Sequence, residues 1–307
     1  MKLLLSHIAD LDGISPIILM NLIGEEFEYQ LFEVKELSSF IQENIETTYF
    51  NKYDKIYITD LGITKECADI IVNSKYKDKF KLFDHHETHY YLNDYEFATV
   101  YEEINGFKEC GTTIFFKYLM ENNSAILSKD SIIHYVELVR EIDTWQFTEL
   151  ENEARDLNSI FDFYGREDFI ERYSKFLNEN NSFYFTEIEQ IILKSLNKKK
   201  QDFLESYKDK VKIRKICGYN VGIVFANKNR SELGNYLAEL YKDSCDIICM
   251  IDLERHVSIR GIKLDKPTNT FAEYFDGGGH PLASGMPLAD DILDKVIDLI
   301  YGDKLED

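Results

Sequence analysis

The first 90 residues alternate short apolar runs with stretches of helical periodicity, and this alternation restricts the fold of the chain more than any other feature. Strands and helices that alternate at such spacing favour βαβ units around a parallel sheet. We therefore predict an α/β fold with an N-terminal doubly wound, mainly parallel sheet. The expected strands are KLLLS (2–6), EYQLFEV (28–34), KIYITDL (55–61) and KFKLFDHH (79–86), and the helices between them are residues 15–24, 35–45 and 63–75.

The rest of the chain divides into a helical insert and a second, smaller α/β region. The clearest helical patterns are residues 112–123, 132–145 and 186–210, the last of which is long and charged, as expected of a helix that connects two domains. Beyond it we expect a hairpin about Gly218, a helix at 231–243, paired strands at 245–252 and 255–262, a glycine-rich loop and a helix at 290–302. The predicted domains are a metal-binding catalytic domain at 1–185, a linker helix at 186–210 and a substrate-binding domain at 211–307.

Cap signals mark the ends of two of these helices. Ser15, which precedes Pro16, is the expected N-cap of the helix that Gly24 closes. Ser231 is the expected N-cap of the helix at 231–243.

Acidic and imidazole side chains collect where the predicted strands end. In a doubly wound sheet, ligands bind beyond the carboxyl ends of the strands, near the point where the strand order reverses. Residues that are far apart in sequence should therefore converge at this edge. They are His7, Asp10 and Asp12 after the first strand, Asp60 after the strand at 55–61, and Asp84, His85 and His86 after the strand at 79–86.

These residue types indicate a pair of divalent cations. Asp and His suit Mn²⁺ and similar borderline cations, and Asp143 in REIDTW adds one more carboxylate. This residue and the aspartates at 10, 12 and 60 would together balance the charge of two divalent cations. Two such cations generate a nucleophile from water and stabilise the charge of an in-line displacement at phosphorus.

Single members of this set have structural alternatives. An aspartate at a strand end is often only the N-cap of the next helix, as Asp12 or Asp60 would be if it stood alone. His85 and His89 have the i,i+4 spacing of a helical zinc pair, but they follow a strand and lack the HExxH glutamate. We therefore expect His89 to be a bystander or to support a ligand. The isolated histidines, for which we expect no special role, are His134 and His256.

The composition excludes several classes of protein. The five cysteines form no CxxC pair, so we expect buried, reduced thiols rather than a thiolate metal site.

The formal net charge is −21; residues 210–307 hold 13 Lys and Arg against 16 Asp and Glu, which is −3 and leaves −18 for residues 1–209. This balance argues against a groove for long nucleic acid, which usually needs a basic surface. No apolar run approaches the roughly 20 residues of a membrane span, and no signal peptide is evident, so we expect a cytoplasmic protein.

Several stretches taken together resemble the DHH phosphoesterase superfamily. SHIADLDG, ITD, FDHHETH and REIDTW resemble its catalytic motifs, and GGGHPLASG (277–285) resembles the glycine-rich signature of the C-terminal domain that accompanies it. The resemblance covers nearly the whole chain, in the order and approximate spacing of the family. Within the superfamily, LVREIDTWQF, SELGN and FDGGGHPLASG are most similar to the oligoribonucleases, or nanoRNases.

The resemblance implies two sets of metal ligands that share Asp60. The first set is His7, Asp10 and Asp60, and the second is Asp12, Asp60, His85 and Asp143. The resemblance also implies that Asp84 orients a neighbouring histidine and that His86 faces the scissile phosphate. The spacing between His7 and the two aspartates after it varies among relatives, which makes His7 the ligand that the motif defines least.

The C-terminal domain is expected to recognise the substrate. The glycines at 277, 278 and 279 would expose backbone N–H groups, His280 would donate a hydrogen bond, and Arg260 would clamp a phosphate. Further candidate contacts are Ser231 and Asn235. We expect the short substrate to bind in a cleft between the two domains.

The predicted activity is hydrolysis of RNAs of two to five nucleotides to 5′-mononucleotides, with two divalent cations, Mn²⁺ or alternatively Mg²⁺ or Co²⁺. The sequence leaves a homodimer open. The alternatives within the superfamily are a phosphodiesterase or phosphatase of cyclic or linear dinucleotides or of pAp, a single-strand DNA exonuclease and a manganese pyrophosphatase. The alternative outside enzymology is a nucleotide sensor without turnover.

Overall fold

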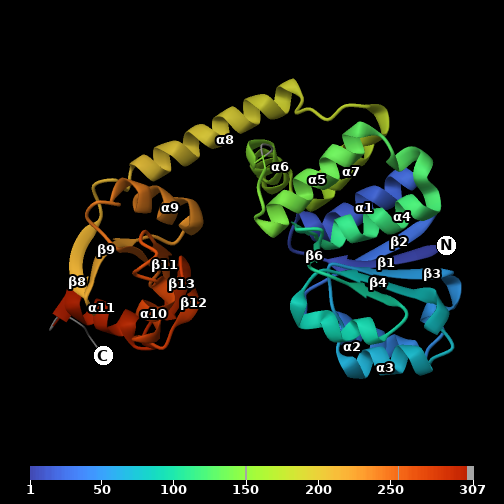
Figure 1. Ribbon diagram of the computed structural model, residues 1–307, viewed down its shortest axis with the longest axis horizontal. Coiled ribbons are helices and arrows are strands. Elements are labelled where there is room, and N and C mark those ends of the chain that lie inside the picture. The colour runs from blue at the N-terminus through green and yellow to red at the C-terminus, as the bar shows by residue number, and fades with distance from the viewer. Residues whose placement is uncertain (149–150, 255, 303–307) are drawn as a thin grey trace. The chain divides into compact units, whose positions relative to one another are not determined.

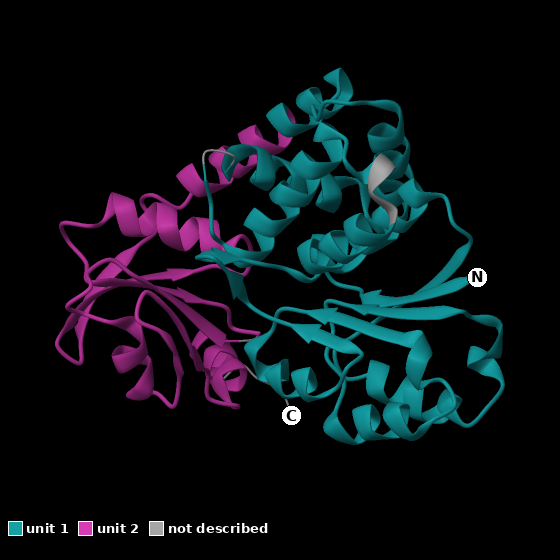
Figure 2. Cartoon of the chain, turned by 45° about the vertical axis from the view of Figure 1, so that its right-hand side comes forward, with its two compact units in different colours: residues 1–194 teal, residues 195–307 magenta. Residues whose placement is uncertain are grey.

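A computed structural model describes residues 1–148, 151–254 and 256–302 and divides the chain into two compact units. Unit 1 is Met1–Lys194 and unit 2 is Ser195–Asp307, as coloured in Figure 2. The division falls inside helix α8 (Glu187–Glu205), the long charged helix that the sequence predicts at 186–210. Within the described residues, no helix combines the length and the apolar character that a membrane crossing requires.

Unit 1 contains a five-stranded sheet in which every strand is parallel to its neighbours, in the order β2-β1-β3-β4-β5. The predicted fold class is therefore confirmed. The chain continues from β1 to β2 on one side and then to β3 on the other, which places the switch point between β1 and β3. The strands are β1 (Lys2–His7), β2 (Phe27–Phe32), β3 (Lys55–Thr59), β4 (Phe80–Asp84) and β5 (Ala98–Val100).

Helices cover both faces of this sheet, as Figure 1 shows. Leu4 of β1 packs in the core under the larger helical layer, whereas Leu3 and Leu5 pack in the core under the smaller one. Neighbouring strand residues thus point to opposite faces, and both faces are buried, as in parallel sheets generally. The larger layer consists of α1 (Leu11–Ile23), α4 (Gly111–Leu127), α5 (Asp130–Thr144), α6 (Glu151–Tyr164) and α7 (Arg166–Glu179), and the smaller one of α2 (Leu37–Ile45) and α3 (Lys65–Asn73).

The start of α1 differs from the prediction. Gly24 does close the helix in a left-handed conformation, but the N-cap is Asp10 rather than Ser15, and the Asp10 side chain accepts a hydrogen bond from the Gly13 N–H. Pro16 therefore lies inside the helix, where it cannot donate to the Asp12 carbonyl. The Thr112 hydroxyl donates to that carbonyl instead, at 2.8 Å, which compensates for the missing helical bond.

Short elements complete unit 1. A small hairpin, β6 (Glu103–Ile104) with β7 (Phe107–Lys108), precedes α4. The 3₁₀ segments are η1 (Tyr49–Lys52), η2 (Lys77–Lys79) and η3 (Glu87–Asp94).

Unit 2 is a six-stranded mixed sheet in the order β12-β13-β11-β10-β9-β8. The predicted hairpin about Gly218 and the antiparallel pair β10–β11 are both present. The core on one face of the sheet includes Leu233 of α9, and the core on the other includes Phe271 of α10. The elements are β8 (Lys212–Ile216), β9 (Tyr219–Phe225), α9 (Arg230–Leu240), β10 (Ile247–Ile251), β11 (His256–Gly261), α10 (Thr268–Glu273), β12 (Gly278–His280), β13 (Ala283–Pro287) and α11 (Ile292–Tyr301).

Two predictions for unit 2 are wrong in detail. The glycine-rich stretch forms the edge strand β12, which pairs with β13, rather than a loop. Gly279 has φ +136°, and a Cβ there would lie 2.7 Å from the Ser284 backbone, so this pairing requires glycine. The N-cap of α9 is Asn229, and Ser231 lies inside the first turn of the helix.

Candidate metal centre

The side chain of Asp60 lies at the centre of the predicted site. Asp60 follows β3, is only 3% exposed and has a left-handed backbone with φ 54°. Only Gly, Asn and Asp adopt this conformation readily, so a turn of this kind accepts an aspartate. Gly111 packs directly against it, since a Cβ on Gly111 would lie 2.8 Å from the Asp60 backbone nitrogen.

One group of possible ligand atoms lies on the β1 side of Asp60. His7 Nδ1 is 3.2 Å from Asp60 Oδ2 and 3.7 Å from Asp10 Oδ2. The other oxygen of Asp10 caps α1, which holds this carboxylate at the end of β1. His7, the least certain of the predicted ligands, therefore lies beside the two carboxylates with which the resemblance groups it.

A second group lies on the opposite side of Asp60. His85 Nε2 is 3.4 Å from Asp60 Oδ1, 3.4 Å from Asp143 Oδ2 and 4.0 Å from Asp12 Oδ2. Both His85 Nε2 and Asp143 Oδ2 are buried and have no hydrogen-bond partner among the described residues. A buried polar atom without a partner is costly unless something else satisfies it.

These two groups have the donor atoms and the spacing of cation sites. The sets His7, Asp10, Asp60 and Asp12, His85, Asp143 each offer ligand atoms within 4.8 Å of one another. Donor atoms that share one cation at about 2.1 Å lie roughly 3 to 4 Å apart. A cation in the second group would satisfy the two orphaned atoms, so the residues present fit a divalent cation.

The crowding of carboxylates shifts their protonation. Burial and the nearby Asp12 carboxylate raise the pKa of Asp60 to about 6, and the same two causes raise the pKa of Asp143 to about 8. Burial alone would lower the pKa of His85, but the carboxylates around it raise it to about 10. Protons thus partly neutralise the apo site, and a cation would replace them.

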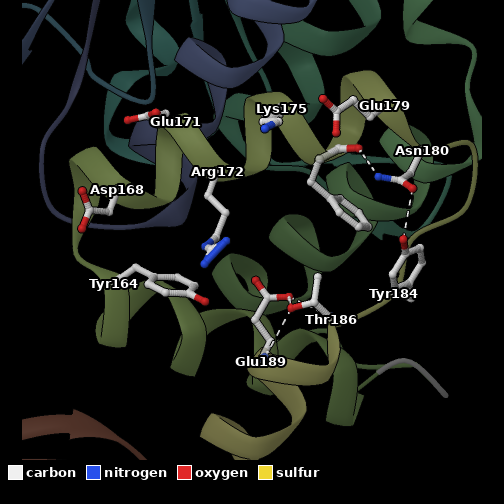
Figure 3. A pocket seen from close by; sticks show the side chains of 11 residues that line it. Tyr164, Asp168, Glu171, Arg172, Lys175, Glu179, Asn180, Tyr184, Thr186 and Glu189 are labelled. Carbon is white, nitrogen blue, oxygen red and sulfur yellow. Dashed lines mark hydrogen bonds between the residues drawn. The ribbon is translucent and has the colours of Figure 1, made fainter.

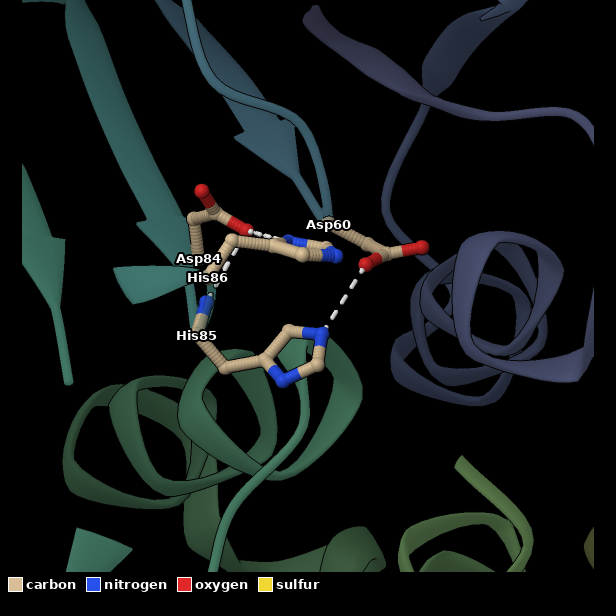
Figure 4. A group of neighbouring side chains, drawn as sticks. All are labelled: Asp60, Asp84, His85 and His86. Atoms are coloured by element: carbon tan, nitrogen blue, oxygen red, sulfur yellow. Dashed lines mark hydrogen bonds and ion pairs between the residues drawn. The ribbon is translucent and has the colours of Figure 1, made fainter. Parts of the chain in front are cut away.

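Asp84 supports the histidines that follow it (Figure 4). Its Oδ1 lies 2.8 Å from His86 Nδ1, and its Oδ2 lies 2.5 Å from His89 Nδ1. Burial alone would raise the pKa of Asp84, but the hydrogen bonds from these two imidazoles lower it below its usual range. Asp84 also accepts a bond from the His85 N–H, so one carboxylate orients the whole segment.

The two histidines on Asp84 differ in exposure. The His86 side chain is 48% exposed, and the hydrogen bond to Asp84 raises its pKa. His89 is less exposed and lies against Gly62, where a Cβ would overlap its ring. His86 can therefore present its second ring nitrogen to a substrate, whereas His89 is placed to hold Asp84.

The N-terminus of α4 is part of the site, although the sequence analysis did not include it. The Gly111 and Thr112 N–H groups each donate to the Asp12 carboxylate at 2.7 Å. Free N–H groups at a helix start suit a carboxylate, so Asp12 is held by a helix about 100 residues further along the chain. The Gly-Thr-Thr sequence that opens α4 was the one local pattern that could have indicated this contact.

The contact with Gly111 leads to a first prediction. We expect Gly111→Ala to push Asp60 and the start of α4 apart, because the added Cβ would meet backbone rather than a flexible side chain. Overpacking of this kind costs about 1 to 3 kcal/mol, and we expect cation affinity to fall about tenfold or more. Isothermal titration with Mn²⁺ measures the affinity, and thermal unfolding measures the stability. Glu121→Ala, on an exposed part of the same helix, is the control; unchanged affinity in Gly111→Ala would contradict this account.

The predicted substrate residues of unit 2 gather on one sheet face. Arg260 and His280 both pair with Ala283, one from each side, and directly paired residues of antiparallel strands point to the same face. The Arg260 guanidinium donates to the Ser231 hydroxyl at 2.9 Å, so Ser231 positions Arg260 instead of capping α9. Asn235 is exposed one helical turn beyond Ser231.

Backbone is accessible beside these side chains. Gly278 has no atom within 4 Å of the position of a Cβ, whereas Gly277 packs against the Gly285 carbonyl. Of the three predicted glycines, Gly278 therefore offers open backbone, and Gly277 and Gly279 permit close strand packing. His256, for which no role was expected, contacts Arg230 on the neighbouring helix. The distance from His256 Nε2 to Arg230 Nη1 is 3.1 Å.

A cavity of about 640 Å³ in unit 1 is lined by none of the predicted site residues (Figure 3). The buried Glu189 accepts bonds from the N–H and the hydroxyl of Thr186, which is a capping box at the start of α8. The Arg172 guanidinium lies over the Tyr164 ring at 4.5 Å. These contacts serve the junction of α7 and α8, and the candidate metal centre lies elsewhere in the unit.

Comparison with known proteins supports the resemblance. The chain is 29% identical over 296 residues to the oligoribonuclease NrnB of Bacillus subtilis, which is 94% of this chain and 73% of that protein. No family model matches it. The structure of the pGpG-specific phosphodiesterase PggH from Vibrio cholerae matches with a TM-score of 0.55 and 13% identity over 97% of both chains, which shows the shared fold. The predicted resemblance and the predicted enzyme class, a phosphodiesterase hydrolase, are thus confirmed.

Proposed function

We propose that this chain, a phosphodiesterase hydrolase similar over nearly its whole length to a DHH-type oligoribonuclease, cleaves RNAs of two to five nucleotides into 5′-mononucleotides with the help of two divalent cations. The observation that carries the proposal is the convergence, at the switch point of the sheet, of two ligand groups around Asp60, the second of which contains two orphaned buried atoms.

The ligands in this proposal are those of the two groups. His7, Asp10 and Asp60 would hold one cation, and Asp12, Asp60, His85 and Asp143 would hold the other, so that Asp60 is shared. Mn²⁺ is the cation that a mixed set of carboxylates and imidazoles suits well. When bound, the cations would supply a hydroxide nucleophile and neutralise charge at the phosphate.

The protein's own groups would orient the reaction around that phosphate. Asp84 fixes the imidazole of His86 through Nδ1, and the His86 side chain is 48% exposed. His86 would donate a hydrogen bond to a phosphate oxygen or to the leaving oxygen, which lowers the cost of the charge that develops there. The N-terminus of α4 holds Asp12 in place, so the ligand need not reorganise when the cation binds.

Unit 2 would recognise the end of the substrate. Arg260, held by Ser231, would bind a phosphate with its guanidinium, and His280 and the open backbone at Gly278 would donate further hydrogen bonds. Asn235 would contact the nucleotide from the exposed side of α9. A few cationic groups of this kind suit a few phosphates, which agrees with a chain of net charge −21.

A competition assay tests the function. Purified protein with Mn²⁺ or Mg²⁺ should hydrolyse labelled RNA dimers to pentamers to 5′-mononucleotides faster than DNA dimers, pAp or a cyclic dinucleotide. The fold shared with a pGpG-specific phosphodiesterase makes linear dinucleotides such as pGpG the second candidate substrate. A strong preference for pGpG would replace oligoribonucleotides with that candidate, and binding without cleavage of any substrate would indicate a sensor.

The role of unit 2 has its own prediction. We expect His280→Ala to lower kcat/KM for an RNA dimer about tenfold to a hundredfold, because it removes a hydrogen bond to a charged phosphate. Metal content, measured by elemental analysis, should stay near that of the wild type because His280 holds no cation. His134→Ala, which removes a histidine paired with Glu153 elsewhere, is the matched control. A His280→Ala enzyme with wild-type kinetics would exclude His280 from substrate binding.

A further inference from the structure

The only tryptophan of the chain lies beside the proposed metal centre with its side chain largely in solvent. Trp145 is 63% exposed and follows Asp143, whose carboxylate lies 3.4 Å from His85, by two residues. Two residues of chain span at most about 7 Å. The indole therefore starts close to the proposed cation ligands, while its ring is one of the most exposed large apolar surfaces of unit 1.

The backbone of Trp145 makes this choice of residue unusual. It closes α5 in the left-handed region, with φ 53° and ψ 24°. Helices that end in this way mostly use glycine, and a bulky side chain there is strained. Strain that persists in a fold often accompanies a functional side chain. Local backbone preference thus does not account for a tryptophan at this position.

Two neighbouring side chains contact the indole. The Phe147 ring meets it edge-on at 5.8 Å, and the Arg155 guanidinium lies 5.5 Å from its centre and 4.4 Å from the centre of Phe147. Glu151 fixes Arg155 through an ion pair at 2.9 Å. The next residue, Gln146, is also anchored, because its amide accepts from the Lys108 N–H and donates to the Gly106 carbonyl.

We propose that the Trp145 indole is a stacking surface for a nucleobase of the substrate, next to the phosphodiester that the metal centre holds. This inference rests on the proposed function and assigns a substrate-binding residue to it. An exposed aromatic ring that follows a proposed cation ligand by two residues matches the way proteins bind single-stranded nucleic acid. Stacking does not read hydrogen-bond patterns, so Trp145 would accept any base and favour purines, whose rings are larger.

Intrinsic fluorescence tests the stacking directly, since the signal comes from one tryptophan. Titration with 5′-AMP, in the presence of Mn²⁺, should quench the emission of Trp145. Ribose 5-phosphate, which has the same phosphate and sugar but no base, should leave the emission unchanged at saturating concentration. Equal quenching by both ligands, or by neither, would overturn the inference.

Kinetics supply a second test. We expect Trp145→Ala to raise KM for an ApA dimer about tenfold to a hundredfold with kcat within about threefold, because stacking is present in both the bound substrate and the transition state. Trp145→Phe should recover most of the loss, and thermal unfolding should show that both variants fold. Phe163→Ala, which removes an aromatic ring 52% exposed on α6, is the matched control and should keep the wild-type KM.

The outcomes separate this inference from the proposed function. If the wild type hydrolyses RNA dimers and Trp145→Ala has the same KM, the stacking role is wrong and the function stands. If the wild type hydrolyses no oligonucleotide, the proposed function is wrong, and the comparison of AMP with ribose 5-phosphate alone decides whether Trp145 stacks on a base.

Discussion

Asp60→Asn is expected to lower kcat for RNA dimers about a thousandfold or more. The amide cannot replace a carboxylate that, in the proposed site, neutralises two cations, and preorganised charge at the phosphate carries much of the catalysis in such sites. Asn is preferable to Ala for this experiment, because Asp60 has φ 54° and Asn tolerates that backbone whereas Ala does not. Steady-state hydrolysis with saturating Mn²⁺ measures the effect.

The same substitution should make the apo protein more resistant to heat. Asp60 is 3% exposed beside other carboxylates, and removal of its charge relieves their repulsion. A variant that is more stable and yet inactive would show that the loss of turnover is not a loss of folding. Asp168→Asn, on an exposed part of α7, is the control. Wild-type activity in Asp60→Asn would disprove the assignment of a shared ligand.

Stabilisation by divalent cations is expected to be large and to increase with pH. A cation at about a thousand times its Kd adds roughly 4 kcal/mol, which corresponds to about 10 °C in Tm for a unit of this size. We expect the difference in Tm between Mn²⁺ and chelator to be small at pH 5.5 and largest near pH 8. Differential scanning fluorimetry over this range, with and without chelator, measures it.

The predicted increase of cation stabilisation with pH follows from the raised pKa values of three side chains in the site. Asp60, with a pKa of about 6, and Asp143, with a pKa of about 8, hold protons in the folded apo protein that they would lose when unfolded. His85, with a pKa of about 10, likewise keeps its proton more tightly when folded. A folded state that binds more protons loses stability as pH rises. Cation binding releases those protons, so affinity increases over the same range.

A control separates specific binding from a general effect of ionic charge. Asp143→Asn should reduce the Mn²⁺-dependent increase in Tm, whereas the exposed Asp168→Asn should leave it intact. A shift that does not depend on pH, or that decreases as pH rises, would contradict the proposed ligands.

Much of unit 1 follows from patterns along the chain. The four predicted strands lie within two residues of β1 to β4. Three of them, β1, β3 and β4, are short apolar runs that a parallel sheet buries on both faces, whereas β2 is an edge strand that is partly exposed. The two helices α6 and α7 were expected only as part of a helical region. The N-cap of α1 was predicted wrongly, since Pro16 normally marks the first turn and here lies further inside the helix.

The sequence predicted which residues come together in the candidate site, but not which atoms they contact. The carboxylates and histidines at the strand ends do come together, as the sheet topology requires. The hydrogen bonds from the α4 N-terminus to Asp12, and the bond from Arg260 to Ser231, could not be predicted from the spacing of residues along the chain. They join residues 99 and 29 positions apart, respectively.

The sequence by itself determined which residues end the strands of a parallel sheet, because strand length and side-chain type are properties of consecutive residues. Only the tertiary structure decided which oxygen each histidine faces, that a helix start holds Asp12 and that the indole of Trp145 stays in solvent. The physical reason is that hydrogen-bond partners and exposure depend on how distant segments pack. A single Cβ on Gly111 would alter that packing without changing any local pattern.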